Sequence, residues 1–235
     1  MDLKRVIKRL WEMFQPTAIV TARMRRDWDD RARRNARHFV ATAKQEWNDQ
    51  EFFESGRTWI RYYVLPDLPL ICGSRSASDL RMLELGCGAG RMTRGFSEIF
   101  RFVDAIDVSP EMIEKARGAL ADCQNVRFHL TDGSTLSMFP DCEFDFIFSA
   151  IVFQHIPRKS IIHNYISEAC RLLRPGCVFK FQVQGGVIRR WDIDTWCGVG
   201  FSKTEIHKIA DQCGFTVHET TGAGTQYFWV TLIKR

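Results

Sequence analysis

The stretch Arg81-Met-Leu-Glu-Leu-Gly-Cys-Gly-Ala-Gly-Arg-Met-Thr93 decides the fold of this chain. A short apolar run enters a turn with glycine at positions 86, 88 and 90, and a helical pattern follows at once. Glycine permits positive φ, and without a Cβ the backbone can approach a bound nucleotide closely. The stretch therefore predicts a strand, a tight loop and a helix start that together cradle a nucleotide.

The spacing of the glycines differs from that of a dinucleotide-binding loop. Such a loop needs its third glycine at position 91, where a pyrophosphate settles on the helix N-terminus, but this chain has Arg91. The pattern Glu84-x-Gly86-x-Gly88-x-Gly90 resembles motif I of the class I S-adenosylmethionine-dependent methyltransferases. In that family the acidic residue faces the amino acid portion of the ligand, and no phosphate has to be held.

Two more predicted strands end in acidic residues. Asp107 follows the apolar run 103–106, twenty-one positions after Gly86, and Asp132 follows the run 126–130. The resemblance, which covers about residues 78–235, implies that Asp107 accepts hydrogen bonds from the ribose hydroxyls and that Asp132 lies near adenine. An isolated aspartate at such a position more often caps a helix or forms a turn.

Ligands of open α/β sheets bind beyond the carboxyl ends of the strands. The residues there are therefore predicted to surround S-adenosylmethionine, the cofactor that the resemblance implies. The predicted cofactor-binding residues are Glu84, Gly86, Cys87, Gly88, Ala89, Gly90, Asp107, Val108, Met112, Asp132, Gly133, Ser134, Ser149, Ala150 and Gln154.

The segment Gln154-His155-Ile156-Pro157 resembles a segment of many small-molecule methyltransferases. Nucleic-acid amino-methyltransferases carry an Asn/Asp/Ser-Pro-Pro-aromatic tetrapeptide there, so its absence argues against a nucleic-acid partner. His155 is the candidate general base because an unperturbed imidazole has a pKa near ~6.5. The alternative is that His155 only bonds to backbone and holds the loop, and Gln154 is predicted to contact cofactor or acceptor.

The acceptor pocket is expected to combine the N-terminal helices with the segment 185–200, which has turn residues around two tryptophans. Its arginine pair, Arg189 and Arg190, either pairs with an anionic acceptor or lies solvated on a surface loop. The predicted substrate-binding residues are Trp59, Tyr63, Arg189, Trp191 and Trp196.

From residue 81 onward, strand and helix patterns alternate, which favours a doubly wound, mainly parallel sheet in an α/β fold. The resemblance implies a Rossmann-like seven-stranded sheet that ends in an antiparallel hairpin, with the last strand between the fifth and the sixth. We expect an N-terminal helical lid over residues 1–72, a linker at 73–80 and the cofactor-binding domain at 81–235.

Residues 2–14 form a predicted basic amphipathic helix. Its apolar stripe either packs on the domain or across a homodimer, or attaches the chain to an anionic membrane surface. The first 50 residues hold twelve Lys/Arg against seven Asp/Glu, which accounts for the whole net charge of +5.

The chain has 235 residues, with 45% hydrophobic and 26% charged residues, as in an ordinary soluble protein. No apolar run approaches the ~20 residues that span a bilayer, and no cleavable signal pattern opens the chain, so we expect a cytoplasmic location. Its eight cysteines lack zinc-type spacing, so we expect reduced, mostly buried thiols and no metal.

The sequence thus predicts methyl transfer from S-adenosylmethionine to a small or lipid-like acceptor at O, N or S. Two alternatives remain open at this point. One is a non-catalytic domain that binds S-adenosylmethionine and serves as an adaptor, and the other is a nicotinamide-dependent oxidoreductase.

Overall fold

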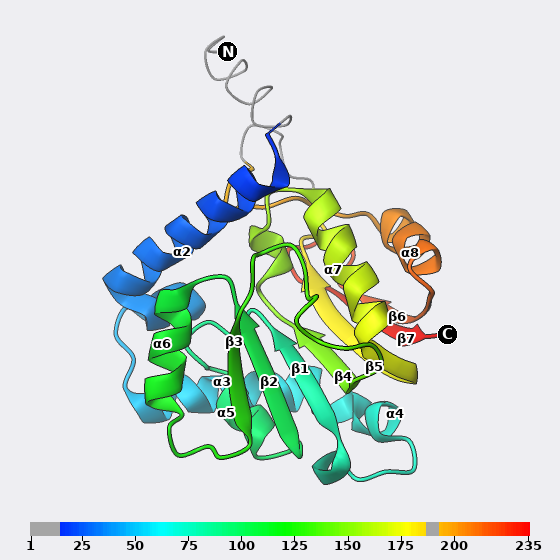
Figure 1. The fold of residues 1–235 in the computed structure, drawn as a ribbon, viewed down its shortest axis with the longest axis horizontal. Coiled ribbons are helices and arrows are strands. Elements are labelled where there is room, and N and C mark those ends of the chain that lie inside the picture. The colour runs from blue at the N-terminus through cyan, green and yellow to red at the C-terminus, as the bar shows by residue number, and fades with distance from the viewer. Residues whose placement is uncertain (1–14, 187–192) are drawn as a thin grey trace.

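The structure is a computed structural model that describes residues 15–186 and 193–235. Within those residues one sheet has the strand order β3-β2-β1-β4-β5-β7-β6 (Figure 1). The predicted helix at 2–14 lies outside the described residues. The strands are β1 (Arg81–Leu85), β2 (Phe102–Asp107), β3 (Val126–Leu130), β4 (Phe144–Ser149), β5 (Leu173–Val183), β6 (Phe215–Thr221) and β7 (Phe228–Lys234).

The strand directions confirm the predicted fold class. Strands β1 to β5 pair in parallel, whereas β7 pairs antiparallel with both β5 and β6. The final hairpin thus inserts the last strand between the fifth and the sixth, as expected. Parallel strands present their carboxyl ends at one edge of the sheet, so the loops after β1, β2, β3 and β4 gather there.

Local sequence signals set the helix boundaries. Ser109 caps α6 by accepting a hydrogen bond from the Met112 amide, and Ser202 forms a capping box with Glu205 at α8. The helix predicted directly after the glycine loop is five residues long. The helices are α2 (Thr17–Val40), α3 (Asp49–Tyr63), α4 (Leu68–Cys72), α5 (Thr93–Ser97), α6 (Pro110–Ala119), α7 (Lys159–Leu172) and α8 (Lys203–Gln212), with 3-10 turns η1 (Leu65–Asp67), η2 (Ala77–Asp79) and η3 (Phe153–His155).

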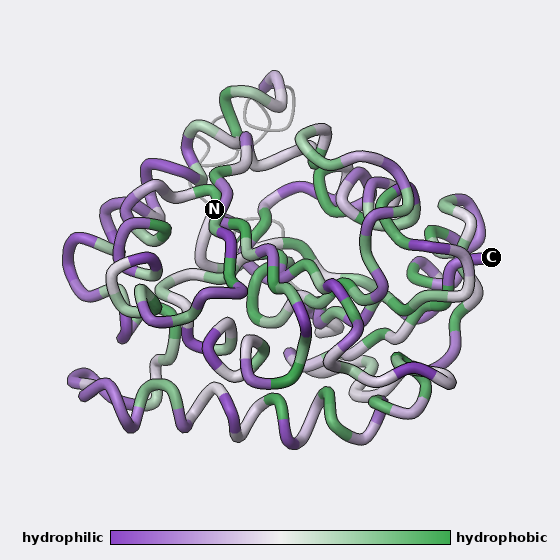
Figure 2. Tube along the Cα trace, turned by 60° about the horizontal axis from the view of Figure 1, so that its bottom comes forward, coloured by the Kyte–Doolittle hydropathy of each residue, from purple (hydrophilic) through white to green (hydrophobic). Residues whose placement is uncertain are grey.

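The helices cover both faces of the sheet. Figure 1 shows α7 in front of the strands and α3 behind them. Side chains of α7 and α8, such as Ile162 and Ile206, pack in one hydrophobic core, and those of α3 and α5, such as Ile60 and Phe96, pack in another. Hydrophobic segments concentrate at the centre of the trace, and hydrophilic ones lie around it (Figure 2).

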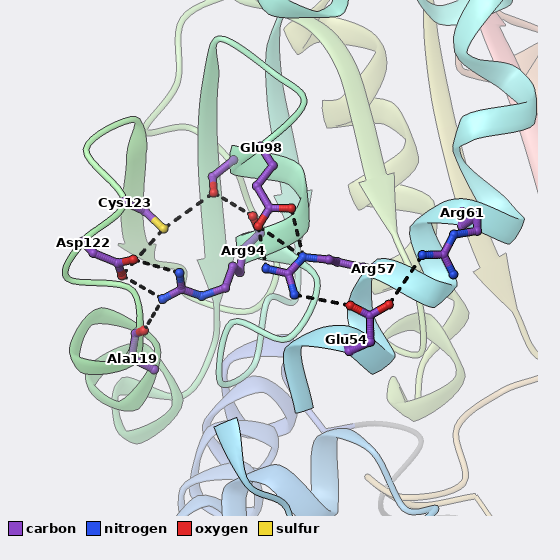
Figure 3. A network of polar contacts seen from close by, with 9 residues as sticks. Glu54, Arg57, Arg61, Arg94, Glu98, Ala119, Asp122 and Cys123 are labelled. Carbon is purple, nitrogen blue, oxygen red and sulfur yellow. Dashed lines mark hydrogen bonds and ion pairs between the residues drawn. The ribbon is translucent and has the colours of Figure 1, made fainter. Parts of the chain in front are cut away.

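Helix α3 packs directly on the start of α5. A Cβ at Gly56 would lie 2.0 Å from the carbonyl oxygen of Arg91, so only glycine allows this approach. Arg57 of α3 also pairs with Glu98, with an Nη2 to Oε1 distance of 2.6 Å (Figure 3). Helix α3 therefore packs against the sheet domain. The expected linker, residues 73–80, contains the 3-10 turn η2.

Asp145 has a structural role at the start of β4. Its carboxylate is buried and accepts hydrogen bonds from Arg75 and Arg174, each at 2.6 Å. Asp145 therefore lies at the amino end of β4, away from the carboxyl edge of the sheet. Of the eight cysteine thiols Cys87 is buried, Cys142 is exposed and the other six are partly buried, so the expected full burial of most thiols is not found. No helix in the described part of the chain is long and apolar enough to cross a bilayer.

Candidate functional site

Two cavities meet at the carboxyl edge of the sheet. Cavity A is bounded by the loop 84–92, by the segments after β2 and β4, and by α2 above them. Cavity B lies beside it, between residues 39–59 and the loops that hold Trp196 and Tyr227. The two share a boundary formed by Phe39, Val40, Arg91, Ile151 and His155.

The glycine loop has the conformation that its sequence predicts. Gly86 and Gly88 have φ of 75° and 54°, a region that favours glycine. A Cβ at Gly86 would lie 2.2 Å from the side chain of Val152, and one at Gly88 would lie 2.7 Å from that of Val40. The bare backbone therefore permits both the turn and the close approach of the segments that roof cavity A.

Glu84 ends β1 as a buried acid in cavity A. Its side chain is 5% exposed, and its Oε2 accepts a hydrogen bond from the Thr93 hydroxyl at 2.6 Å. Burial raises the pKa of Glu84 to about 7, against the opposing effects of the Thr93 hydrogen bond and the charge of Arg91. A cationic ligand group in cavity A would stabilise the ionised carboxylate.

Asp107 ends β2 and faces the same loop. Its two oxygens accept hydrogen bonds from the backbone amides of Gly88 and Ser109, each at 2.9 Å. Burial raises the pKa of Asp107 to about 6, although these amide hydrogen bonds lower it. Asp107 therefore ties the glycine loop to the start of α6 and still presents a carboxylate to cavity A.

Helix α2 is fastened across the strand ends. The Arg25 guanidinium donates to the carbonyls of Val108 at 3.2 Å and Thr131 at 3.1 Å. Asp29 is buried and accepts a hydrogen bond from the Ser109 hydroxyl at 2.5 Å. These contacts place Met24 and Trp28 in the wall of cavity A.

His155 lies in a chain of side-chain hydrogen bonds. One ring nitrogen, Nδ1, is 2.6 Å from the Trp196 carbonyl, which can only accept, so Nδ1 carries the proton. The other, Nε2, is 3.2 Å from the Gln154 side-chain nitrogen, and Gln154 accepts in turn from Gln182 at 3.0 Å. Burial lowers the pKa of His155 to about 4, so the imidazole is neutral at neutral pH.

Ile151 has an unusual backbone conformation beside His155. Its φ of 58° is in the left-handed region, which is unfavourable for a β-branched residue and costs on the order of 1–3 kcal/mol. Its amide donates to the Gln182 side chain at 3.1 Å, which holds the turn. Such strain is typical of functional sites, and Ile151 lines both cavities.

Arg91 is the charged residue that separates the two cavities. Its side chain is 6% exposed, and its guanidinium carbon lies 5.0 Å from the centre of the Trp59 ring. Nη1 makes a long hydrogen bond of 3.4 Å to the Ser55 carbonyl, and within the described part of the chain Nε is buried without a partner. Burial lowers the pKa of Arg91 to about 10, so it stays charged at neutral pH.

The structure brings most of the predicted site residues to the cavities. Of the predicted substrate-binding residues, Arg189 and Trp191 lie outside the described residues. Cavity A is lined by Glu84, Gly86, Cys87, Gly88, Asp107, Val108, Met112, Ala150 and His155, and cavity B by Trp59, Gln154, His155 and Trp196.

Other predicted residues line neither cavity. Asp132 is exposed, and its Oδ1 accepts hydrogen bonds from the amides of Ser134 and Thr135 at 2.7 Å each, so it forms its own turn. Tyr63 is partly buried against a hydrophobic core and stacks on Trp229 with ring centres 4.3 Å apart. Ala89, Gly90, Gly133, Ser134 and Ser149 also line neither cavity; Ser149 donates to the Leu85 carbonyl, and a Cβ at Gly90 would meet Leu120. Ligand contact by these residues stays a prediction that the cavity linings do not support.

Several residues that line the cavities were not predicted from the sequence. Arg91 was noted in the sequence only because it departs from the pattern of a dinucleotide-binding loop. Trp28 and Phe39 belong to the predicted N-terminal lid, but nothing in the local sequence indicates which of its rings face a cavity. Other lining residues that were not predicted include Met24, Val40, Trp47, Thr131, Ile151, Val152, Tyr165, Gln184, Gln226 and Tyr227.

Comparison with known proteins finds a match across the loop that bounds cavity A. Residues 82–176 match the family model described as methyltransferase domain. Over 95 residues the chain is 34% identical to a demethylmenaquinone methyltransferase of Tropheryma whipplei, which covers 40% of this chain and 38% of that protein. It is 30% identical over 96 residues to a 2-methyl-6-phytyl-1,4-hydroquinone methyltransferase of Synechocystis, covering 40% and 29% of the two chains. The chain thus spans less than half the length of these curated relatives.

Solved structures share the fold at low sequence identity. Magnesium protoporphyrin IX methyltransferase of Synechocystis, with bound S-adenosylhomocysteine, superposes with a TM-score of 0.67 and 16% identity, covering 92% of this chain and 100% of that chain. A methyltransferase of Aquifex aeolicus has a TM-score of 0.57 and 20% identity, covering 81% and 100%. These similarities support the fold described here over most of the chain.

Proposed function

We propose that this chain is a class I S-adenosylmethionine-dependent methyltransferase that transfers the methyl group to a small or lipid-like acceptor at O, N or S. The match of residues 82–176 to a methyltransferase domain and the shared fold support this proposal. The observation that carries this proposal is the pair of carboxylates, Glu84 and Asp107, in cavity A beside the bare glycine backbone. Two carboxylates repel a diphosphate, and they attract the cationic sulfonium and ammonium groups of S-adenosylmethionine. The same pair argues against a nicotinamide cofactor.

The residues of cavity A fit this cofactor. Glu84 is a buried acid whose hydrogen-bond donor, Thr93, is uncharged, so it suits the ammonium group. Asp107 suits the ribose hydroxyls, and the apolar side chains of Val108 and Met112 suit the faces of adenine. Bound there, the cofactor supplies a methyl carbon made electrophilic by the positive sulfur.

The residues of the chain would align the acceptor, exclude water and take up the proton that the acceptor releases. Helix α2 shields cavity A from solvent, and cavity B holds the acceptor on the far side of Ile151 and His155. The protonated Nδ1 of His155 is fixed on the Trp196 carbonyl, so Nε2 has the free lone pair. An acceptor that keeps its proton at neutral pH would give it to Nε2, which first releases the side chain of Gln154.

Calorimetric titration tests the cofactor assignment. We expect S-adenosylhomocysteine to bind and NADH not to bind, because of the two carboxylates. Absence of S-adenosylhomocysteine binding would overturn the proposed function. Transfer of a labelled methyl group to a panel of phenols, acids, amines and thiols then separates an enzyme from a non-catalytic adaptor.

Residues 2–14 carry a separate part of the proposal, namely peripheral contact with an anionic membrane or with a second copy of the chain. The support is the amphipathic basic pattern of their sequence. Sedimentation with anionic liposomes, with and without residues 1–15, tests the membrane contact. Equal pelleting of both forms would exclude the membrane contact. A mass measurement in solution tests whether the chain forms a homodimer.

A further inference from the structure

Cavity B has walls that suit a flat aromatic molecule. Side chains of Trp47, Trp59, Trp196 and Tyr227 line it, and they come from well-separated parts of the chain. Trp196 is 41% and Tyr227 is 45% exposed, so two of these rings border solvent. Aromatic rings offer large, rigid surfaces on which another ring can stack with ring centres ~4.5–7 Å apart.

The charges around cavity B favour an anion. Within the described part of the chain, Arg91 is the one lining residue that is charged at neutral pH, and no Asp or Glu lines the cavity. The polar groups that accompany it are neutral, namely the amides of Gln154, Gln184 and Gln226 and the imidazole of His155. A cationic acceptor would meet Arg91 without any compensating carboxylate.

The positive charge of Arg91 has few compensating contacts in the protein. A buried cation normally has close hydrogen bonds or an ion pair, because removing it from water is costly. The Arg91 guanidinium instead has one long hydrogen bond to Ser55 and a buried, unpartnered Nε within the described residues. The carboxylate that acts on its charge, Glu84, is already hydrogen-bonded to Thr93. A ligand carrying an anionic group would complete the coordination of Arg91.

We propose that cavity B recognises a planar aromatic acceptor that bears a carboxylate or phenolate, and that Arg91 is the residue that selects for the negative charge. This inference rests on the proposed function, since it names the acceptor class of the same site. The aromatic walls select the ring, and the cation at the boundary with cavity A orients the anionic group.

Binding to the full-length protein saturated with S-adenosylhomocysteine tests this proposal without requiring turnover. The probes are 2-naphthoate, 2-naphthalenemethanol and 2-naphthylmethylamine, which share a ring and differ in charge. Quenching of tryptophan fluorescence reports binding because Trp47, Trp59 and Trp196 line the cavity. We expect 2-naphthoate to bind at least tenfold more tightly than the amine, with the alcohol between them.

Arg91→Met should remove this preference, whereas Arg91→Lys should keep part of it. Arg101→Met is the matched control, because Arg101 is exposed and lines neither cavity. Affinity for S-adenosylhomocysteine is measured first for each variant, so failure of the proposed function is seen separately. Equal binding of the three probes, or an Arg91→Met variant that keeps the preference, would overturn the inference. So would a variant that loses only S-adenosylhomocysteine, since Arg91 would then bind the carboxylate of the cofactor.

Discussion

The Nδ1 atom of His155 donates a hydrogen bond of 2.6 Å to the carbonyl of Trp196, forty-one residues away. This contact fixes the imidazole tautomer and holds the loop that contributes Trp196 to cavity B. The rings of Trp28 and Trp196 also flank the imidazole, with centres 5.3 Å and 5.1 Å from it. His155 therefore anchors the loop, which is one of the two roles that the sequence left open, and it lies at the boundary of the two cavities. Its role as a general base stays a prediction.

Replacing His155 tests its proposed role as the base. We expect His155→Phe to lower kcat by ~10²–10⁴-fold, the usual contribution of a general base, while affinity for S-adenosylhomocysteine stays within a few-fold. Because the pKa of His155 is lowered to about 4, the base form persists as pH falls. With saturating cofactor, kcat of the natural protein should therefore stay level from pH 8 down to about 5. A decline centred near the ordinary imidazole value would contradict this assignment.

The buried carboxylate of Glu84 is expected to lower the stability of the ligand-free protein and to contribute to binding of the cofactor. Its pKa is about 7 in the folded protein against an ordinary value of 4.5, so the folded state binds the proton more strongly. Stability therefore falls as pH rises between these values, and the cost persists above them. Glu84→Gln should raise the free energy of unfolding at pH 8 by about 3 kcal/mol, have little effect at pH 4, and weaken S-adenosylmethionine binding. Urea denaturation at both pH values measures this, and a loss of stability at pH 8 would refute it.

Asp107 is predicted to bind the ribose of the cofactor. Asp107→Ala should weaken binding by one to two orders of magnitude, because hydrogen bonds to a charged group contribute ~1.5–3 kcal/mol. Part of the loss would come from freeing the Gly88 amide, which Asp107 holds. Asp107→Asn keeps an oxygen acceptor and should lose less. Unchanged affinity of Asp107→Ala in calorimetry would remove Asp107 from the cofactor site.

Two glycines offer a matched test of the loop. Gly88→Ala should destabilise the protein by ~1 kcal/mol or more and weaken cofactor binding, because its φ is 54° and its Cβ would meet Val40. Gly118→Ala lies in α6, where a Cβ meets nothing within 4 Å, so we expect it to stabilise by up to ~1 kcal/mol. Thermal unfolding of both variants measures the two effects. Similar shifts for the two would show that the loop imposes no special demand for glycine.

Much of the fold could be read from local signals. The glycines of the loop are needed for its positive φ values, and Ser109 and Ser202 accept hydrogen bonds from amides at helix starts. Each of these signals depends on a few neighbouring residues. The same reasoning placed Glu84 and Asp107 at the carboxyl edge, because every parallel strand ends there. The hairpin at the end of the sheet was implied by the resemblance instead.

Which of these residues face a cavity was decided by contacts between distant segments. Asp132 has the same strand-end position as Asp107, yet its carboxylate turns to Ser134 and Thr135, and the neighbouring Thr131 lines cavity A instead. Arg31 donates to Thr195 across 164 residues, which brings α2 and the loop of Trp196 together.

The sequence by itself determined the sheet, the glycine loop and the carboxylates beside it, because backbone conformation and capping are set by residues close in the chain. The tertiary structure alone decided that Arg91 is a buried cation between two cavities and that His155 is neutral. Burial and the distances between charges exist only once segments far apart in the chain have packed together.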